Sequence, residues 1–174
     1  MAEVVVLTRG GARAAGDALA ASHAEYPAFR HILPDPRRRA RALRPFFTAT
    51  VADAVPFGAV YAAVDGSLVL GVAAWLPPGA FPWSAWRKAR ATPAFLRVMA
   101  ADPRAFPTFA RLGANAERAH PDEPHWFLEV LGIRPEAQRQ GWGTRLVQPA
   151  LDRADAAGVP SALETSDPAN VAYY

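Results

Sequence analysis

The stretch that decides the fold is RPEAQRQGWGTRLVQPAL, Arg134–Leu151, in which two glycines stand one residue apart just before a helical pattern. Gly141 and Gly143 weaken a helix start, so the lack of side chains there must serve another need. The preceding run His125–Ile133 is almost continuously apolar, as expected of an interior strand. Apolar residues then recur at helical spacing through Gly143–Ala157. The order is strand, glycine-rich loop and helix.

This order favours an anion-binding loop. The first N–H groups of a helix have no partner within it, and the helix dipole favours negative charge at that end. A Rossmann dinucleotide loop is excluded because Leu146 stands where the third glycine is required. A Walker loop is excluded because no Gly-Lys-Ser/Thr occurs. The remaining pattern is Gln138-x-x-Gly141-x-Gly143.

That pattern resembles the Gln/Arg-x-x-Gly-x-Gly/Ala motif of the GNAT superfamily of acyl-CoA-dependent N-acyltransferases. Its surroundings are similar too: an apolar strand ending in VLGIRP, the loop, the helix, a strand containing LETS, and then Asn170-x-x-x-Tyr174. The resemblance implies a mixed α/β (α+β) GNAT fold, whose mostly antiparallel central sheet has splayed fourth and fifth strands and flanking helices. We expect one domain over residues 1–174. Family members continue through further strands, so we also expect the chain to be trimmed after Tyr174.

By the same resemblance, acetyl-CoA is the cosubstrate and the end of the fourth strand is bulged. The backbone there, at Leu131, Gly132 and Ile133, would pair with the pantetheine arm. Asn170 would contact the same arm. Trp142 is bulkier than usual for its position, and either packs beneath the loop or covers the adenine. The loop residues that would hold the pyrophosphate, or fix the loop around it, are Gln138, Arg139, Gln140, Gly141, Trp142, Gly143 and Thr144.

Transfer of an acetyl group to an amine needs a base for the amine and an acid for the departing thiolate. The resemblance gives the acid role to Tyr174, which shares a helical face with Asn170 if Asp167-Pro168 begins a last helix. Glu129 and Glu164 are both candidates for the base, because an acid within an apolar strand acquires a raised pKa. Proton loss through water is the third alternative.

The rest of the chain supplies the other expected elements. Phe81–His120 combines aromatic residues and prolines, which indicates short helices that serve either as core and lid packing or as an acceptor pocket. EYPAFRHILPDP indicates a loop or a broken helix. The expected strands and helices elsewhere are strand Glu3–Thr8, helix Ala12–Ser22, helix Arg37–Asp53, and the hairpin of Ala59–Val64 with Leu68–Leu76.

Composition excludes several classes of site. The chain has no cysteine, so it has no disulfide, no thiolate metal site and no cysteine nucleophile. Its four histidines show no ligand spacing, and we expect no metal. The apolar runs are too short for a signal peptide or a membrane span, which favours a cytoplasmic protein. DPRRRARALR, Asp35–Arg44, is either a nucleic-acid patch or, as we prefer, the solvated face of a helix.

These observations favour an acetyl-CoA-dependent N-acetyltransferase that modifies the primary amine of a small molecule, for example an antibiotic. A second hypothesis is a non-catalytic acyl-CoA sensor, and a third is a protein or peptide N-acetyltransferase. A nucleic-acid-binding domain that uses Arg37–Arg44 is a weaker alternative. We expect neither a nucleic-acid nor a membrane partner, and either a monomer or a homodimer.

Overall fold

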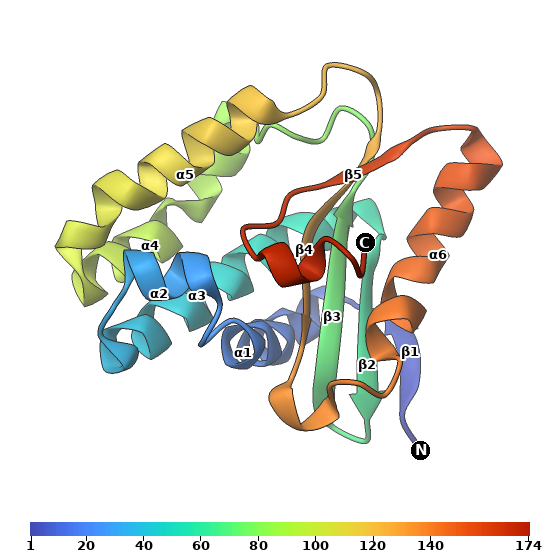
Figure 1. Ribbon diagram of the computed structural model, residues 1–174, viewed down its shortest axis with the longest axis horizontal. Coiled ribbons are helices and arrows are strands. Elements are labelled where there is room, and N and C mark those ends of the chain that lie inside the picture. The colour runs from blue at the N-terminus through green and yellow to red at the C-terminus, as the bar shows by residue number, and fades with distance from the viewer.

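The computed structural model describes residues 1–174 and contains one five-stranded sheet in the order β1-β2-β3-β4-β5 (Figure 1). The first four strands pair antiparallel, and β5 pairs parallel with β4. This is the predicted mixed α/β arrangement with a mostly antiparallel sheet. The strands are β1 Glu3–Val6, β2 Val60–Asp65, β3 Leu68–Leu76, β4 Trp126–Ile133 and β5 Ser161–Leu163.

Helices cover both faces of the sheet (Figure 1). The helices α1, α2 and α3 lie on one face of the sheet, and α6 lies on the other. The helices α4 and α5 extend the layer of α1–α3 away from the sheet. No helix is long and apolar enough to cross a membrane. The helices are α1 Ala12–Ser22, α2 Pro27–Ile32, α3 Pro36–Ala54, α4 Ala85–Ala101, α5 Phe106–Ala119 and α6 Trp142–Ala157, with 3-10 turns at Arg9–Gly11, Val55–Phe57, Pro103–Ala105, Pro135–Ala137 and Pro168–Asn170.

Two hydrophobic cores result from the alternation of side chains along the strands. Val60 and Ala62 of β2 face α1 and α3, whereas Tyr61 and Ala63 belong to the core beneath α6. α1 approaches α3 closely at Gly16, where a Cβ would lie 2.3 Å from Thr48 Oγ1. The glycine therefore sets the separation of these two helices.

The basic run Asp35–Arg44 forms the first half of α3. Asp35 caps this helix by accepting hydrogen bonds from the backbone of Arg37 and Arg38, at 2.8 and 2.9 Å. Arg44 donates two hydrogen bonds to Asp17 on α1, and Arg39 is buried against Leu33 O and Glu25. The run thus contributes ion pairs as well as a solvated face.

Two expectations about the helices were wrong. Phe81–His120 does not form short helices but the long α4 and α5, because Pro107 lies in the first turn of α5, where its missing N–H costs nothing, and α4 tolerates Pro93 within it. The expected last helix is only the 3-10 turn Pro168–Asn170 followed by turns.

Candidate active site

The strands β4 and β5 diverge at the centre of the molecule. They pair only from Trp126 to Leu128. After this point β5 ends, and β4 continues to Ile133 without a strand on that side. On its other side β4 is bulged: Ala74 pairs with Val130 and Trp75 with Leu128, which leaves Glu129 as the extra residue. The free backbone edge at Leu131, Gly132 and Ile133 is open to an extended ligand.

Gly132 lies where α1 ends against β4. A Cβ at this position would lie 2.1 Å from Ser22 Oγ and 2.9 Å from His23 Cε1. The absence of a side chain therefore lets α1 pack directly on the part of β4 that extends beyond its pairing with β5. His23 is buried there, and desolvation lowers its pKa to about 4, so the ring is neutral at physiological pH.

The glycine-rich loop presents a row of free backbone donors. The first hydrogen bond of α6 runs from Arg145 N to Gly141 O at 3.2 Å, and no N–H group from Arg139 to Thr144 has a partner within the protein. Arg139 and Gly141 have positive φ angles of 58° and 78°, the left-handed conformation that occurs in anion-binding turns. This geometry fits a pyrophosphate at the start of a helix.

Two glutamine side chains fix the shape of this loop. Gln138 Nε2 donates to Ile133 O at 3.1 Å and so ties the loop to the end of β4. Gln140 Nε2 donates to Glu136 O at 3.3 Å. Both side-chain amides therefore donate within the protein. Gln138 and Gln140 would contact a ligand mainly through their backbone.

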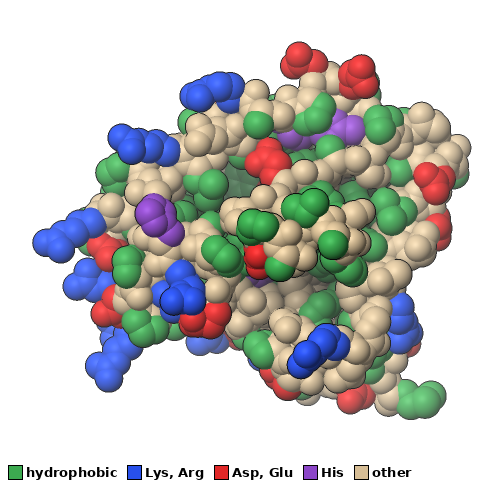
Figure 2. All heavy atoms as spheres, in the orientation of Figure 1, with side chains coloured by type: hydrophobic (Ala, Val, Ile, Leu, Met, Phe, Trp, Pro, Cys, Tyr) green, Lys and Arg blue, Asp and Glu red, His purple; other side chains and the backbone are tan.

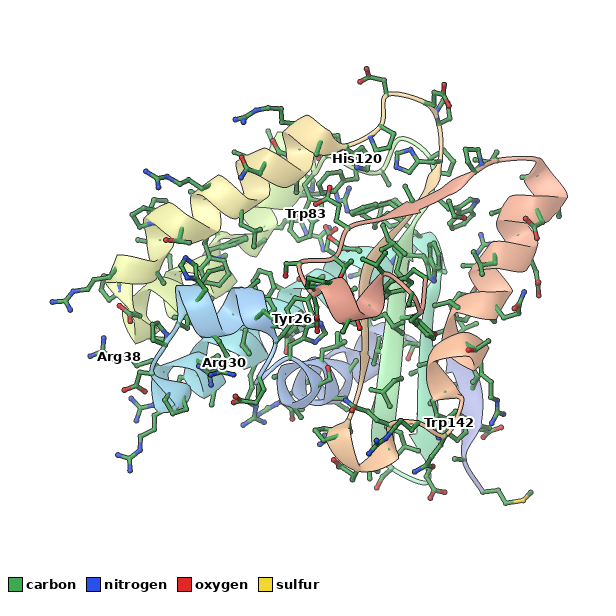
Figure 3. The ribbon with its side chains drawn as sticks, in the orientation of Figure 1. Tyr26, Arg30, Arg38, Trp83, His120 and Trp142 are labelled. Atoms are coloured by element: carbon green, nitrogen blue, oxygen red, sulfur yellow. The ribbon has the colours of Figure 1, made fainter.

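Trp142 lies beneath the loop, which decides between the two positions that the sequence allowed. Its side chain is buried in the core under α6, and the Arg145 guanidinium lies 4.2 Å from its ring centroid (Figure 3). Sequence reasoning missed a neighbour, Tyr173, whose hydroxyl would lie 2.6 Å from a Cβ at Gly143. The phenol of Tyr173 therefore covers the first turn of α6.

A cavity of about 470 Å³ lies beside a larger one of about 670 Å³, and the larger holds most of the remaining candidates. Figure 2 shows a hollow between the α5 side of the molecule and the C-terminal segment, with hydrophobic side chains gathered around it. The candidates that line this larger cavity are Glu129, Leu131, Glu164, Asn170 and Tyr174. The acid and base candidates and one end of the splayed strand are thus brought together.

Glu129 has the most strongly perturbed carboxyl group of the cavity. Its Oε1 accepts a hydrogen bond of 2.8 Å from Trp83 Nε1, and its Oε2 is buried without any partner. Desolvation raises the pKa of Glu129 to about 8; the Trp83 bond and Arg87 oppose this rise, whereas Asp53 adds to it. Trp83 lies between α5 and the sheet (Figure 3), and the Arg87 guanidinium, paired with Asp53, lies 5.2 Å from its ring.

The other two candidates are more exposed. Glu164 follows β5, makes no hydrogen bond through its carboxylate, and has a pKa raised by partial burial. Tyr174 is 48% exposed, and burial of the remainder raises the pKa of its hydroxyl to about 12. Its backbone N–H donates to Asn170 O at 3.1 Å, which keeps Asn170 and Tyr174 adjacent although no α-helix forms.

Sequence reasoning also missed Tyr26 and Trp83. The Tyr26 hydroxyl lies 3.0 Å from Thr165 Oγ1 and accepts a hydrogen bond of 2.9 Å from Ser166 N, so it holds the segment after β5 in place. No local pattern identifies either residue, because their partners are distant in sequence and meet them only in the folded chain. No group of three or more histidine or acidic residues is arranged to hold a metal ion.

A splayed strand pair beside a glycine-rich helix start is the arrangement of an acyltransferase that takes its acyl group from coenzyme A. Residues 24–174 match the Acetyltransferase (GNAT) family, so the chain belongs to this family, and the prediction of an acetyltransferase is confirmed. GNAT acetyltransferases use acetyl-CoA.

Solved structures show the same fold. A putative acetyltransferase from Pyrococcus horikoshii has a TM-score of 0.61 and 16% identity, over 99% of this chain and 84% of that one. The polyamine N-acetyltransferase of Drosophila melanogaster has a TM-score of 0.57 and 16% identity, over 99% and 79%. The "histone acetyltransferase HPA2 and related acetyltransferase" of Corynebacterium glutamicum has a TM-score of 0.57 and 24% identity, over 88% and 71%.

Proposed function

We propose that the protein is a cytoplasmic N-acetyltransferase, monomeric or homodimeric, that moves the acetyl group of acetyl-CoA to the primary amine of a small molecule. The observation that carries this proposal is the Glu129 carboxyl group, which has a free, buried oxygen in the same cavity as Tyr174 and the open edge of β4. A C–N bond forms and the C–S bond breaks. The amine loses one proton, and the departing thiolate gains one.

The chain offers acetyl-CoA a continuous set of backbone groups. The unpartnered N–H groups of residues 139–144 would bind the pyrophosphate, and Arg139 would add a charge-assisted contact. The unpaired edge of β4 at Leu131–Ile133 would pair with the pantetheine arm, which Asn170 also reaches. N–H groups at such an edge stabilise the negative charge that develops on the carbonyl oxygen.

Glu129 is our choice for the general base. A carboxyl with a pKa of about 8 is ionised in part at neutral pH and is a stronger proton acceptor than an ordinary glutamate. Its Oε2 accepts no hydrogen bond within the protein, so its lone pairs are unused. Glu164 is the alternative base: it is more exposed than Glu129, and partial burial raises its pKa.

Tyr174 is our choice for the acid that protonates the thiolate. Its hydroxyl stays protonated across the physiological range, because its pKa is raised to about 12. Tyr173 is the natural control. Its hydroxyl lies against Gly143 at the phosphate end and does not line the cavity.

A small-molecule acceptor is favoured by the cavity volume of about 670 Å³, which lies within the range of ligand pockets. The segments EPHWFLEVLGI, AGVPSALETS and NVAYY also resemble puromycin N-acetyltransferase, which suggests an antibiotic as one candidate acceptor. The likeness to polyamine N-acetyltransferase is one of fold and does not choose the amine.

The test is free-thiol release from acetyl-CoA with a panel of amines that includes puromycin, an aminoglycoside, amino acid amides and a short peptide. We expect release with at least one small amine, and a kcat lowered about 100-fold in Tyr174→Phe. Tyr173→Phe lies at the phosphate end, so it should change the KM for acetyl-CoA and leave kcat nearly unchanged. Binding of acetyl-CoA without release for any amine would support a sensor instead. Release with the peptide alone would support a peptide acetyltransferase.

A further inference from the structure

The helix α5 carries an apolar face that the protein covers only in part. None of its residues is buried, and Phe106 and Leu112 are 51% and 41% exposed. Both side chains line the large cavity, as do Phe109 and Ala116 on the same helix. A helix with such a face normally buries it against another element. Here the face borders the space in front of Glu129.

Aromatic residues close one end of the cavity. Phe29 and Phe46, on α2 and α3, pack against Phe109 on α5, with ring centroids 6.3 and 5.8 Å from that of Phe109. Phe95 on α4 extends this group, 6.2 Å from Phe46. In total, 18 of the 27 residues that line the cavity are hydrophobic. A ligand held here must therefore bury apolar surface.

The charges of the cavity are few and unevenly placed. Glu117 on α5 is neutralised by Lys88, at 2.7 Å, so the α5 wall offers no free carboxylate. The other two acids lie where β4 and β5 separate, Glu129 on β4 and Glu164 directly after the end of β5. Negative charge is thus available where the reacting amine must sit, but not at the far end of the ligand.

We propose that the acceptor is a primary amine on a bulky apolar, aromatic body, with no second positive charge at the far end. The amine nitrogen lies at Glu129, and the apolar body fills the cavity along α5, against the exposed side chains of Phe106 and Leu112. This assignment rests on the proposed function and specifies its substrate class. Polyamines and guanidino amines are poorer acceptors, because the only carboxylate on the α5 wall, Glu117, is already paired with Lys88.

Three amides that share one reacting α-amine provide the test: phenylalaninamide, alaninamide and argininamide, each followed by thiol release from acetyl-CoA. Burial of the phenyl group raises kcat/KM for phenylalaninamide about 30-fold or more above that for alaninamide. Argininamide is acetylated no better than alaninamide. A kcat/KM for argininamide or alaninamide that equals or exceeds the value for phenylalaninamide would overturn the acceptor class. The acetyltransferase function would still stand.

A matched pair of variants on α5 locates the apolar body. Leu112→Asp places a carboxylate on the cavity wall, whereas Asn115→Asp adds the same charge to the same helix outside the cavity lining. The phenylalaninamide-to-argininamide ratio of kcat/KM falls about tenfold or more in Leu112→Asp and is unchanged in Asn115→Asp. Equal ratios in the two variants would overturn the placement.

The two proposals fail in different ways. If no amine of either panel releases thiol, the proposed function fails and the acceptor class fails with it. If only puromycin or another amine with an aromatic body is acetylated, both stand. If an aminoglycoside is the best acceptor, the enzyme is an acetyltransferase of a polycation, and the acceptor class is wrong.

Discussion

At the scale of single residues, the proposed chemistry depends on the environment of one carboxyl group. Glu129 occupies the bulge of β4, with one oxygen held by Trp83 and the other buried without a partner. Burial disfavours the ionised form, and the Trp83 hydrogen bond favours it. Trp83 is therefore a positioning residue in our account: it orients the carboxyl group and limits the rise of its pKa.

This balance predicts the effect of Trp83→Phe. Removal of the indole N–H removes a hydrogen bond that stabilises the carboxylate, so the pKa of Glu129 rises further and its ionised fraction at neutral pH falls. We expect kcat/KM at pH 7 to fall about tenfold or more and to recover in part at higher pH. A loss of equal size at every pH would indicate that Trp83 acts only through packing.

At the scale of elements, glycines set how closely the helices approach one another and the sheet. Gly16 lets α1 approach α3 closely, and Gly132 lets the end of α1 lie against β4. These contacts fix the layer that carries His23 and Tyr26 toward the cavity. The cavity geometry therefore depends on residues that contact no ligand.

We expect Gly16→Ala to destabilise the protein. The new Cβ would lie 2.3 Å from Thr48 Oγ1 and 2.8 Å from Thr48 N, so the α3 backbone must move. Overpacking of this kind costs about 1–3 kcal/mol, which exceeds the helix propensity of about 1 kcal/mol that alanine gains. Urea denaturation measures the net loss. Gly10→Ala is the control, since nothing lies within 4 Å of its Cβ; equal stability of the two variants would contradict this account.

Many of the helices and strands could be predicted from the sequence, because runs of β-branched residues and the helical spacing of apolar residues are local signals. The helix Ala12–Ser22 and the strand Leu68–Leu76 have the bounds that the sequence predicted. Glu129 could be singled out because an acid within an apolar strand is unusual. Trp83 could not, since its partner lies 46 positions away. The length of α4 could not be predicted, because the prolines of Phe81–His120 indicate short helices, whereas α4 continues through Pro93.

At the scale of the whole molecule, the separation of β4 from β5 brings two kinds of site together. One end of β4 meets the row of free N–H groups before α6, and the bulge on the same strand faces the aromatic cavity. A cosubstrate bound along the strand edge and an amine bound in the cavity would therefore meet near Glu129. The fold in this way supports direct transfer between two bound substrates.

The most direct test of this account compares kcat/KM for one amine in the wild-type protein and in Glu129→Gln between pH 6 and 9.5. The ratio of the two values cancels the ionisation of the amine itself and leaves that of the residue. With the pKa of Glu129 at about 8, its base form increases as pH rises. We predict a ratio that increases nearly tenfold per pH unit below 8 and levels off above it, at about 100 or more. A ratio that stays constant across this range would contradict the assignment of Glu129 as the base.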